Sequence, residues 1–260
     1  MTGLVCLMYH ELERARQEPS RTEPGYLRYV VREADFRAQL NQLANGGLLG
    51  LNVGQALVAQ PEGRPKLAIT FDDGAQTDLV VAAPLLREAG HNATFFVTVG
   101  CLNQRGYLTF AQVRELHELG FEIGCHSMTH AFLTDCSPHQ LQVEVIESRA
   151  RLQDLIGAPV LHFSCPGGRW KPHISEIALS AGYVSVATSR IGVNNLPPNP
   201  LRLSRIPILR HMTTTSVLHF SQGKRLIRIR AGQQLRRAAT SLLGNVNYEA
   251  LRTRLLRSVK

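Results

Sequence analysis

The chain has 260 residues, of which 44% are hydrophobic and 19% are charged, so it can bury a core and form one large α/β domain. Its net charge of +9 at pH 7 is uneven, because Glu249 is the single acid between Lys224 and Lys260. No stretch approaches the roughly 18 apolar residues of a spanning helix, which excludes an integral helical membrane protein. The N-terminus lacks a basic segment and a cleavage site, so we expect a cytoplasmic protein that is not exported.

The five cysteines are odd in number and scattered along the chain. None of them forms the C-x-x-C spacing of a structural zinc site or a dithiol redox site. We therefore expect reduced thiols.

Apolar runs typical of strands alternate with helical patterns along most of the chain. We expect strands at 3–9, 66–71, 93–99, 121–125, 160–164 and 183–188, and helices at 34–43, 79–89, 110–119, 138–156 and 173–181. Repeated β-then-α units predict parallel strands, in an open sheet or in a barrel. The glycine motifs that bind nucleotides are absent, which favours a barrel with its active residues at the C-terminal ends of the strands.

The segment 223–260 differs from the preceding 1–222 in charge, and we treat it as a helical extension of one domain. The run "RLIRIRAGQQLRRAATSLL" places apolar residues near helical spacing with arginines between them. This pattern fits a basic amphipathic helix on an anionic membrane surface at the inner face, and it fits equally a helix packed on the barrel with a solvated basic face. It has no interleaved aromatic residues, so we expect no nucleic-acid partner.

Two adjacent carboxylates, Asp72 and Asp73, follow the strand-like run "KLAITF". Like charges at the end of a buried strand cost stability unless a cation or a proton offsets them. Other polar residues also follow predicted strands: His10, the pair His126 and His130, and the stretch 164–168. We expect these four units to converge on one rim.

His126 and His130 have an H-x3-H spacing, which would bring both imidazoles to one side if the segment turned helically. Together with Asp73 they make a two-histidine, one-carboxylate set that leaves positions open on a divalent cation. Asp72 could then act as the base toward metal-bound water. Taken singly, the histidines fit an ordinary loop pair and the aspartates fit a capped turn.

Three motifs resemble the polysaccharide deacetylases that share the NodB homology domain, carbohydrate esterase family 4. They are "TFDDG" at 70–74, "HSMTH" at 126–130 and "FSCPGG" at 163–168, with lesser matches at "LMYHEL", "ATFFV" and "RIPIL". The resemblance covers about residues 3 to 210. It implies a distorted (β/α) barrel and metal-dependent removal of N-acetyl groups from a polymeric sugar.

By residue, the resemblance implies Asp72 as the general base and Asp73, His126 and His130 as metal ligands. We expect zinc, with cobalt, nickel, iron or manganese as alternatives. The Gly167 backbone N–H resembles the family's second oxyanion donor, although a plain turn explains that glycine equally well. The subgroup with an early "MYH" suggests His10 as the acid that protonates the leaving nitrogen, and His211 is the alternative.

One departure from the family concerns the base. Where many members carry an arginine that orients it, this chain has Ser164, as in the subgroup with an F-[SA]-x-P signature. Two other functions remain open: hydrolysis of a non-sugar amide by the same machinery, and glycan binding by a protein of the same fold that has lost catalysis. Metal content and acetate release from N-acetylated oligosaccharides would separate them.

Overall fold

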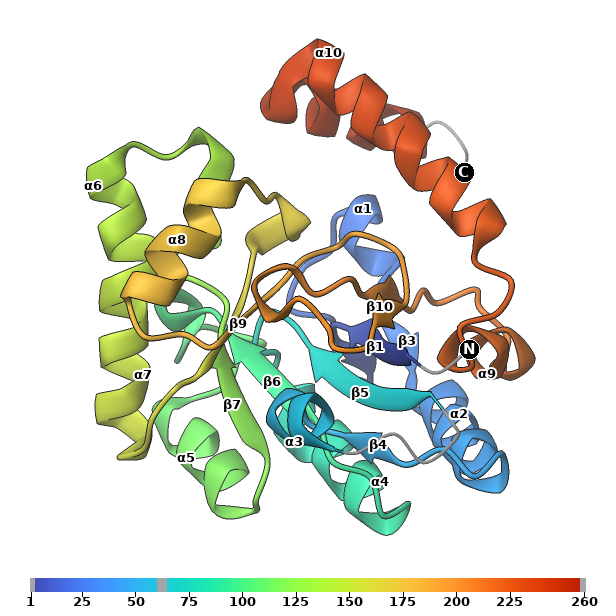
Figure 1. Cartoon of the computed structure of the whole chain (residues 1–260). Coiled ribbons are helices and arrows are strands. Elements are labelled where there is room, and N and C mark those ends of the chain that lie inside the picture. The colour runs from blue at the N-terminus through green and yellow to red at the C-terminus, as the bar shows by residue number, and fades with distance from the viewer. Residues whose placement is uncertain (1–2, 60–64, 258–260) are drawn as a thin grey trace.

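A curved sheet of mainly parallel strands forms the centre of the computed structural model, which describes residues 3–59 and 65–257 (Figure 1). Its strands are β1 (Gly3–Tyr9), β4 (Gly50–Leu51), β5 (Lys66–Phe71), β6 (Thr94–Val97), β7 (Glu122–Cys125), β8 (His162–Ser164), β9 (Ser185–Ala187), β10 (Asn194–Asn195) and β11 (Ile206–Pro207). The order is β10-β1-β5-β6-β7-β8-β9, with β11 on β1 and β4 on β5. β10 is antiparallel to β1. A separate parallel pair joins β2 (Leu12–Glu13) to β3 (Val31–Arg32).

Most of the helices surround the outside of this sheet (Figure 1). The helices are α1 (Pro24–Leu27), α2 (Glu33–Asn45), α3 (Val53–Val58), α4 (Ala83–Glu88), α5 (Phe110–Glu118), α6 (Pro138–Leu141), α7 (Ser148–Ile156), α8 (Pro172–Ser180), α9 (Thr214–Ser221) and α10 (Ile227–Arg257). Two π-helical segments, η1 (Asp78–Ala82) and η4 (Gln142–Glu147), continue into α4 and α7. Short 3-10 turns are η2 (Val99–Cys101), η3 (Leu133–Asp135), η5 (Pro166–Gly168) and η6 (Pro200–Arg202).

The apolar strands are buried because helices cover the outer face and side chains fill the inner one. An aromatic row built on Tyr9, Phe71 and Phe95 runs across β1, β5 and β6, with ring centroids 5.3 Å and 5.1 Å apart. Phe36 of α2 and Phe121 before β7 pack edge-on against this row. The sheet is therefore fixed to its helices by directional aromatic contacts as well as by buried area.

The register of the sheet brings strand ends level. Tyr9 pairs with Phe71 at the last position of β1 and β5, and Val97 pairs with Cys125 at the last position of β6 and β7. Residues that follow these strands consequently emerge at one rim. The convergence expected from the sequence is confirmed in this respect.

The segment 203–207 joins the two edges of the curved sheet. Leu203 makes a parallel bridge to Ala187 at the end of β9, and Ile206 and Pro207 pair with Leu7 and Met8 of β1. The backbone N–H of Ile208 also donates to the Met8 carbonyl, at 2.9 Å. The distorted (β/α) barrel predicted from the sequence is confirmed as a parallel half-barrel sheet, with this segment bridging the gap.

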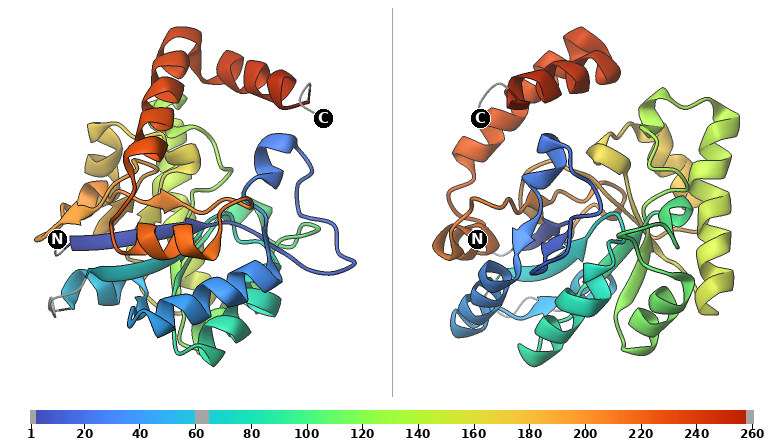
Figure 2. Two further views of the ribbon diagram at one scale, coloured as in Figure 1. Left: turned by 90° about the vertical axis from the view of Figure 1, so that its right-hand side faces the viewer. Right: turned by 180° about the vertical axis from the view of Figure 1, so that it is seen from behind.

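Helix α10 crosses above the rim of the barrel (Figure 2). It bends at Gly244, where φ is 74° and ψ is 165°. The Gln233 side chain accepts from the Ile191 N–H at 2.8 Å and donates to the Ser189 carbonyl, and Asn245 donates to Asp135 at 2.7 Å. The extension therefore contacts the barrel on both sides of its bend.

Several predicted helices agree with the structure to within two residues at each end, including 110–119 and 173–181. The helices α1, α3 and α9 are not predicted from the sequence, because segments of four, six or eight residues carry little periodicity. All five cysteines are free thiols. In the described ranges, no helix has both the length and the apolar character needed to cross a membrane.

Candidate active site

A cavity of about 470 Å³ opens at the C-terminal rim of the barrel. His10 follows β1, Asp72 and Asp73 follow β5, and His126 and His130 follow β7; all five line the cavity. Gly167, in the turn after β8, lines it as well. The structure thus gathers the proposed base, the three proposed ligands, His10 and Gly167 around one cavity, whereas the exposed His211 is not among the described lining residues.

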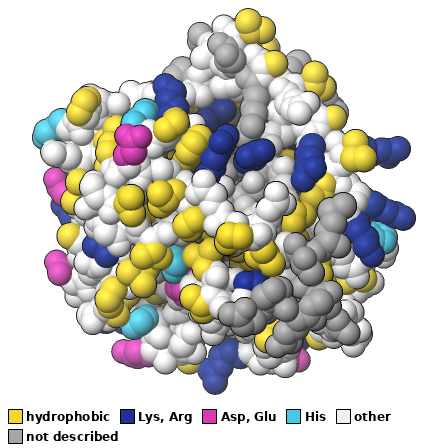
Figure 3. Space-filling view, in the orientation of Figure 1, with side chains coloured by type: hydrophobic (Ala, Val, Ile, Leu, Met, Phe, Trp, Pro, Cys, Tyr) yellow, Lys and Arg dark blue, Asp and Glu magenta, His cyan; other side chains and the backbone are white. Residues whose placement is uncertain are grey.

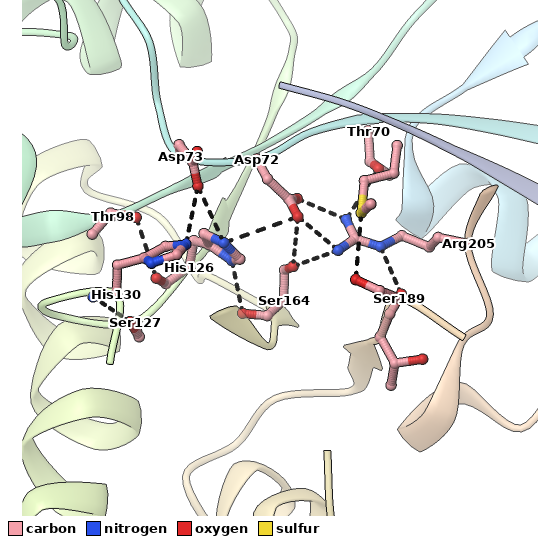
Figure 4. A network of polar contacts seen from close by, with 12 residues as sticks. Thr70, Asp72, Asp73, Thr98, His126, Ser127, His130, Ser164, Ser189 and Arg205 are labelled. Carbon is pink, nitrogen blue, oxygen red and sulfur yellow. Dashed lines mark hydrogen bonds and ion pairs between the residues drawn. The ribbon is translucent and has the colours of Figure 1, made fainter. Parts of the chain in front are cut away.

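Asp73, His126 and His130 converge on one point (Figure 4). The Oδ1 atom of Asp73 lies 3.4 Å from Nε2 of His126 and 3.3 Å from Nε2 of His130. Candidate ligand atoms of the three residues all lie within 4.8 Å of one another. Burial acts to raise the pKa of Asp73, but the neighbouring His126 and His130 imidazoles outweigh it and hold that pKa well below its usual range.

This donor set fits a divalent cation. Asp73 Oδ1 is buried and has no conventional hydrogen-bond partner among the described residues. Donor atoms just over 3 Å apart are spaced as ligands at about 2.0–2.1 Å from a shared zinc ion would be. One carboxylate and two imidazoles also leave coordination positions open.

The backbone is strained at two of these three candidate ligands and at Ser127 between the histidines. Asp73 has φ 83°, Ser127 has φ 69° and His130 has φ 64°, all in the left-handed region that non-glycine residues disfavour. Such strain costs about 1–3 kcal/mol per residue and persists where the surroundings fix the geometry. The segment 126–130 is a loop rather than a helical turn, so the geometry imagined for H-x3-H is wrong. The left-handed residues, and not helical periodicity, bring the two imidazoles together.

Two residues, Ser164 and Glu144, fix the loop 126–130 through hydrogen bonds. Nδ1 of His126 lies 2.9 Å from the Ser164 carbonyl oxygen, which leaves Nε2 facing Asp73. Glu144 of η4 is buried and accepts from the backbone N–H groups of Met128 and Thr129, at 3.0 Å and 2.9 Å, and from the Thr129 hydroxyl. Partners of this kind orient metal ligands.

Asp72 is bound by an arginine from a distant part of the chain. Arg205 donates from both terminal nitrogens to the two carboxylate oxygens, each at 2.7 Å, and its side chain is 1% exposed (Figure 4). Ser164 donates to the same carboxylate at 3.2 Å and accepts from Arg205 at 2.8 Å. Burial acts to raise the pKa of Asp72, but the charges of Arg205 and His126 outweigh it and leave that pKa lowered.

The local sequence does not identify Arg205 as the partner of Asp72. Ser164 stands where an orienting arginine is expected, and Arg205 supplies the guanidinium from another segment. The available signal was an arginine at the head of the apolar run "RIPIL". A buried arginine in such a run needs a carboxylate partner.

His10 lies against the Tyr29 ring, with ring centroids 4.5 Å apart. Its Nδ1 is buried without a hydrogen-bond partner among the described residues. Burial is the largest influence on its pKa and lowers it, while the nearby Asp73 and Asp72 charges act in the opposite direction. His10 thus lies in the cavity lining with one ring nitrogen that no described residue bonds.

Gly167 occupies a turn that a larger residue would disrupt. It has φ 59°, and a Cβ atom there would lie 2.9 Å from the Phe132 ring. The next residue, Gly168, has φ 65° and is closed in by Ser189. The two glycines keep the backbone at the cavity wall.

A family model described as polysaccharide deacetylase matches residues 59–186. The YxkH protein of Bacillus subtilis is 26% identical over 209 residues, which are 79% of this chain and 71% of YxkH. The peptidoglycan-N-acetylglucosamine deacetylase of Bacillus cereus is 31% identical over 130 residues, which are 50% of this chain and 59% of that enzyme.

Among solved structures, the Streptococcus pyogenes deacetylase PplD in complex with acetate has a TM-score of 0.74 and 22% identity. The match covers 86% of this chain and 99% of that one. At this identity the likeness concerns the fold, and it extends well beyond the residues of the family model.

Proposed function

Because the chain belongs to the polysaccharide deacetylase family, we propose that it is a metal-dependent hydrolase that removes N-acetyl groups from a glycan. The observation that carries the proposal is the convergence of Asp73, His126 and His130 beside the buried Asp72. Amide hydrolysis needs an activated water, a stabilised oxyanion and a proton for the leaving nitrogen. The cavity offers residues for each task.

We assign Asp73, His126 and His130 as the ligands of a divalent cation, with zinc as the resident ion. When bound, such a cation would lower the pKa of water and polarise the acetyl carbonyl. The hydrogen bonds from Met128 and Thr129 to Glu144 hold the loop between His126 and His130 in place before a cation arrives. Asp73 is likewise held in its left-handed conformation. Preorganisation of this kind reduces the reorganisation needed during reaction.

Asp72 is the proposed base, accepting a proton from the attacking water. Its Oδ2 lies 3.9 Å from Nε2 of His126. Asp72 therefore borders the cluster of Asp73, His126 and His130, called here the ligand cluster, without belonging to it. Arg205 and Ser164 fix the carboxylate in one orientation and favour its charged form. A base held ionised is ready to accept a proton, although its lowered pKa limits its strength.

His10 is the proposed acid for the leaving nitrogen, and the Gly167 backbone N–H is the proposed donor to the carbonyl oxygen. Both line the cavity, His10 just after β1 and Gly167 in the turn after β8. The missing side chain at Gly167 lets a sugar approach the backbone closely. The substrate would then lie with its acetyl group between these two groups.

Acetate release tests the proposal. The protein should be stripped with a chelator, reloaded with zinc, cobalt, nickel, iron or manganese in turn, and assayed on chitin oligosaccharides, peptidoglycan fragments and exopolysaccharide. We expect acetate from at least one N-acetylated glycan and none after chelation. Metal binding without acetate release from any of these glycans would favour a non-sugar amide or a binding role.

We also propose that α10 places the enzyme at an anionic membrane surface, at the cytoplasmic face. The side chains of Ile227, Leu235 and Leu242 are 82%, 74% and 86% exposed on the helix that carries the basic residues. Exposed apolar groups beside arginines suit the headgroup region of an anionic bilayer. Co-sedimentation with vesicles containing phosphatidylglycerol tests this: binding should require residues 223–260, and binding that survives their deletion would exclude α10 as the anchor.

A further inference from the structure

Glu11, the residue after His10, is a buried carboxylate beside the active-site cavity. It is 2% exposed. The Asp and Glu side chains that Figure 3 shows stand at the surface, mostly toward the left and lower edges of the view. A carboxylate is seldom buried unless hydrogen bonds or an opposite charge offset its lost hydration. The partners of Glu11 therefore show what this burial achieves.

The hydrogen bonds of Glu11 all lead to the segment 20–31. The backbone N–H of Ser20 donates to both carboxylate oxygens, at 2.9 Å and 3.0 Å, and its hydroxyl donates to Oε2 at 2.7 Å. The Tyr26 hydroxyl donates to the same Oε2 at 3.0 Å. The backbone carbonyl of Glu11 accepts from the Val31 N–H, at 3.0 Å. One residue thus holds the start, the middle and the end of this segment.

The segment 20–31, which contains α1, forms one wall of the cavity. Its residues in the cavity lining are Arg21, Glu23, Gly25, Tyr26 and Tyr29. At its start the segment packs closely on the turn that contains Gly106, where an added Cβ atom would lie 2.7 Å from the Cα of Ser20. The position of this wall is therefore fixed at Ser20 by close packing and by the bonds to Glu11.

A short chain of contacts leads from Glu11 to the ring of His10. The Tyr29 N–H donates to the Tyr26 carbonyl at 2.7 Å, and the Tyr29 ring lies against the His10 ring at a centroid distance of 4.5 Å. A histidine is often oriented by a hydrogen bond to one ring nitrogen, but Nδ1 of His10 has no such partner among the described residues. Packing against Tyr29 therefore contributes to the orientation of His10.

We infer that Glu11 is a positioning residue of the active site, which holds Tyr29 against His10 by fixing the segment 20–31. The same hydrogen bonds would also stabilise a loop that has no part in the reaction. The two roles differ in their consequences, because only a positioning role changes the environment of His10 and the protonation of the leaving nitrogen. The kinetic consequence rests on the proposed function, whereas the effect on His10 does not.

The first measurement is the side-chain NMR signal of His10 in the full chain after chelator treatment, assigned by its loss in His10→Ala. Tyr29→Leu removes the aromatic ring and should shift this signal. Glu11→Gln should shift it in the same direction, because its amide N–H groups cannot accept from Ser20 and Tyr26. Glu18→Gln is the matched control: it is exposed in the same loop and pairs with the exposed Arg105, so the signal should not move. An unmoved signal in a folded Glu11→Gln would overturn the inference.

The second measurement compares an amide with an ester in the metal-loaded enzyme. Glu11→Gln should slow hydrolysis of an N-acetyl substrate at least about tenfold and that of an activated acetyl ester less than about threefold, because only the amide depends on a well-placed acid. Glu18→Gln should keep both rates. Equal losses of amide and ester activity in Glu11→Gln would show that the carboxylate only stabilises the loop, and would overturn the inference.

The double variant Ser20→Ala with Tyr26→Phe serves if Glu11→Gln does not fold. It removes both hydroxyl donors and keeps the carboxylate, and it should shift the His10 signal in the direction seen in Tyr29→Leu. An unmoved signal in this variant would again overturn the inference. A parent enzyme that releases no acetate would reject the proposed function, and the His10 signal would then decide the inference alone. Acetate release with an unmoved signal would reject only the inference.

Discussion

Arg205 donates two hydrogen bonds of 2.7 Å to the Asp72 carboxylate, although the two residues are 133 positions apart in the chain. Their contact joins the end of β5 to the segment 203–207 that bridges the edges of the sheet. The same guanidinium donates to Thr70 and to the Thr188 carbonyl. One buried arginine therefore couples closure of the barrel to the orientation of the proposed base.

Arg205→Gln should accordingly damage stability and turnover together. Removing one partner of a buried ion pair leaves the other charge uncompensated and costs about 3–5 kcal/mol. Urea denaturation should reveal that loss, and the surviving folded protein should retain metal but hydrolyse slowly. Arg210→Gln is the matched control, because Arg210 pairs with Glu13 near the surface and such pairs contribute roughly 1 kcal/mol or less. Similar losses in both variants would contradict a special role for Arg205.

The adjacent aspartates should separate by role. Asp73→Ala removes a member of the ligand cluster, so both metal retention and turnover should be abolished. Asp72→Asn keeps the shape of the side chain but cannot accept a proton, so metal should be retained and turnover lost. Metal analysis of the two purified variants checks the prediction. Equal metal loss in both would reject the assignment.

Glu144 should affect metal binding without touching the metal. It is the acceptor for the N–H groups of Met128 and Thr129, which lie between His126 and His130. Glu144→Ala should weaken metal affinity about 10–100-fold, the usual effect of losing a residue that orients ligands. Glu147→Ala, at an exposed position of the same helical segment, should leave metal affinity unchanged. Competition with a fluorescent chelator measures the metal affinity of both variants. An unchanged affinity in Glu144→Ala would mean that the loop keeps its conformation without Glu144.

These predictions draw on features that the sequence shows to different degrees. The run "KLAITF" and the carboxylates after it can be read from the sequence because a strand buried on both faces is continuously apolar. The placement of His126 and His130 after a predicted strand, together with the family resemblance, predicts them as ligands. The helical turn considered between them is wrong, because left-handed backbone at Ser127 and His130 has no periodic signature. The sequence therefore indicates which side chains form the candidate site, but not the backbone conformations that position them.

Long-range partners were harder to predict. Nothing local links Arg205 to Asp72, or Gln233 of α10 to the 189–191 loop, because each contact depends on where the chain returns after many residues. Charge composition marked the C-terminal segment as basic without locating it at the cavity. Local pattern therefore predicts elements and strand-end residues, whereas packing of the whole chain decides which of them meet.

Asp78 should make stability depend on pH. Its carboxyl is fully buried without a hydrogen-bond partner among the described residues, and burial, aided by the charges of Glu11, Asp73 and Asp72, raises its pKa well above the usual range. The folded state then holds a proton that the unfolded state loses near pH ~3.9. Stability is therefore lost as pH rises from that value through the folded pKa.

Asp78→Asn removes this titration, so its stability relative to the parent should rise with pH above ~4 and level off above the folded pKa. Urea denaturation of chelator-treated proteins from acid to neutral pH measures the difference. The amide is also buried, so a constant offset is expected and only the slope is diagnostic. Asp154→Asn, at an exposed position, should show no such slope. A flat difference for Asp78→Asn would mean that the carboxyl is ionised in the folded protein.

His10, rather than His211, should protonate the leaving nitrogen. His10 lines the cavity with Asp73, His126 and His130, whereas His211 is exposed beyond β11 and is absent from the described lining. Loss of a general acid typically costs ~10²–10⁴-fold in rate. His10→Ala should slow turnover of an N-acetyl substrate by that order and leave metal content unchanged, while His211→Ala should do little.

Two further measurements distinguish an acid from a structural histidine. Activity that needs protonated His10 falls as pH rises through its pKa, which burial lowers, so His10→Ala should lose this descending limb of the pH–rate profile. An activated acetyl ester has a good leaving group that needs little protonation, so its hydrolysis should be far less affected than that of the amide. Equal loss of ester and amide activity in His10→Ala would show that this histidine shapes the cavity and that the proton comes from another group.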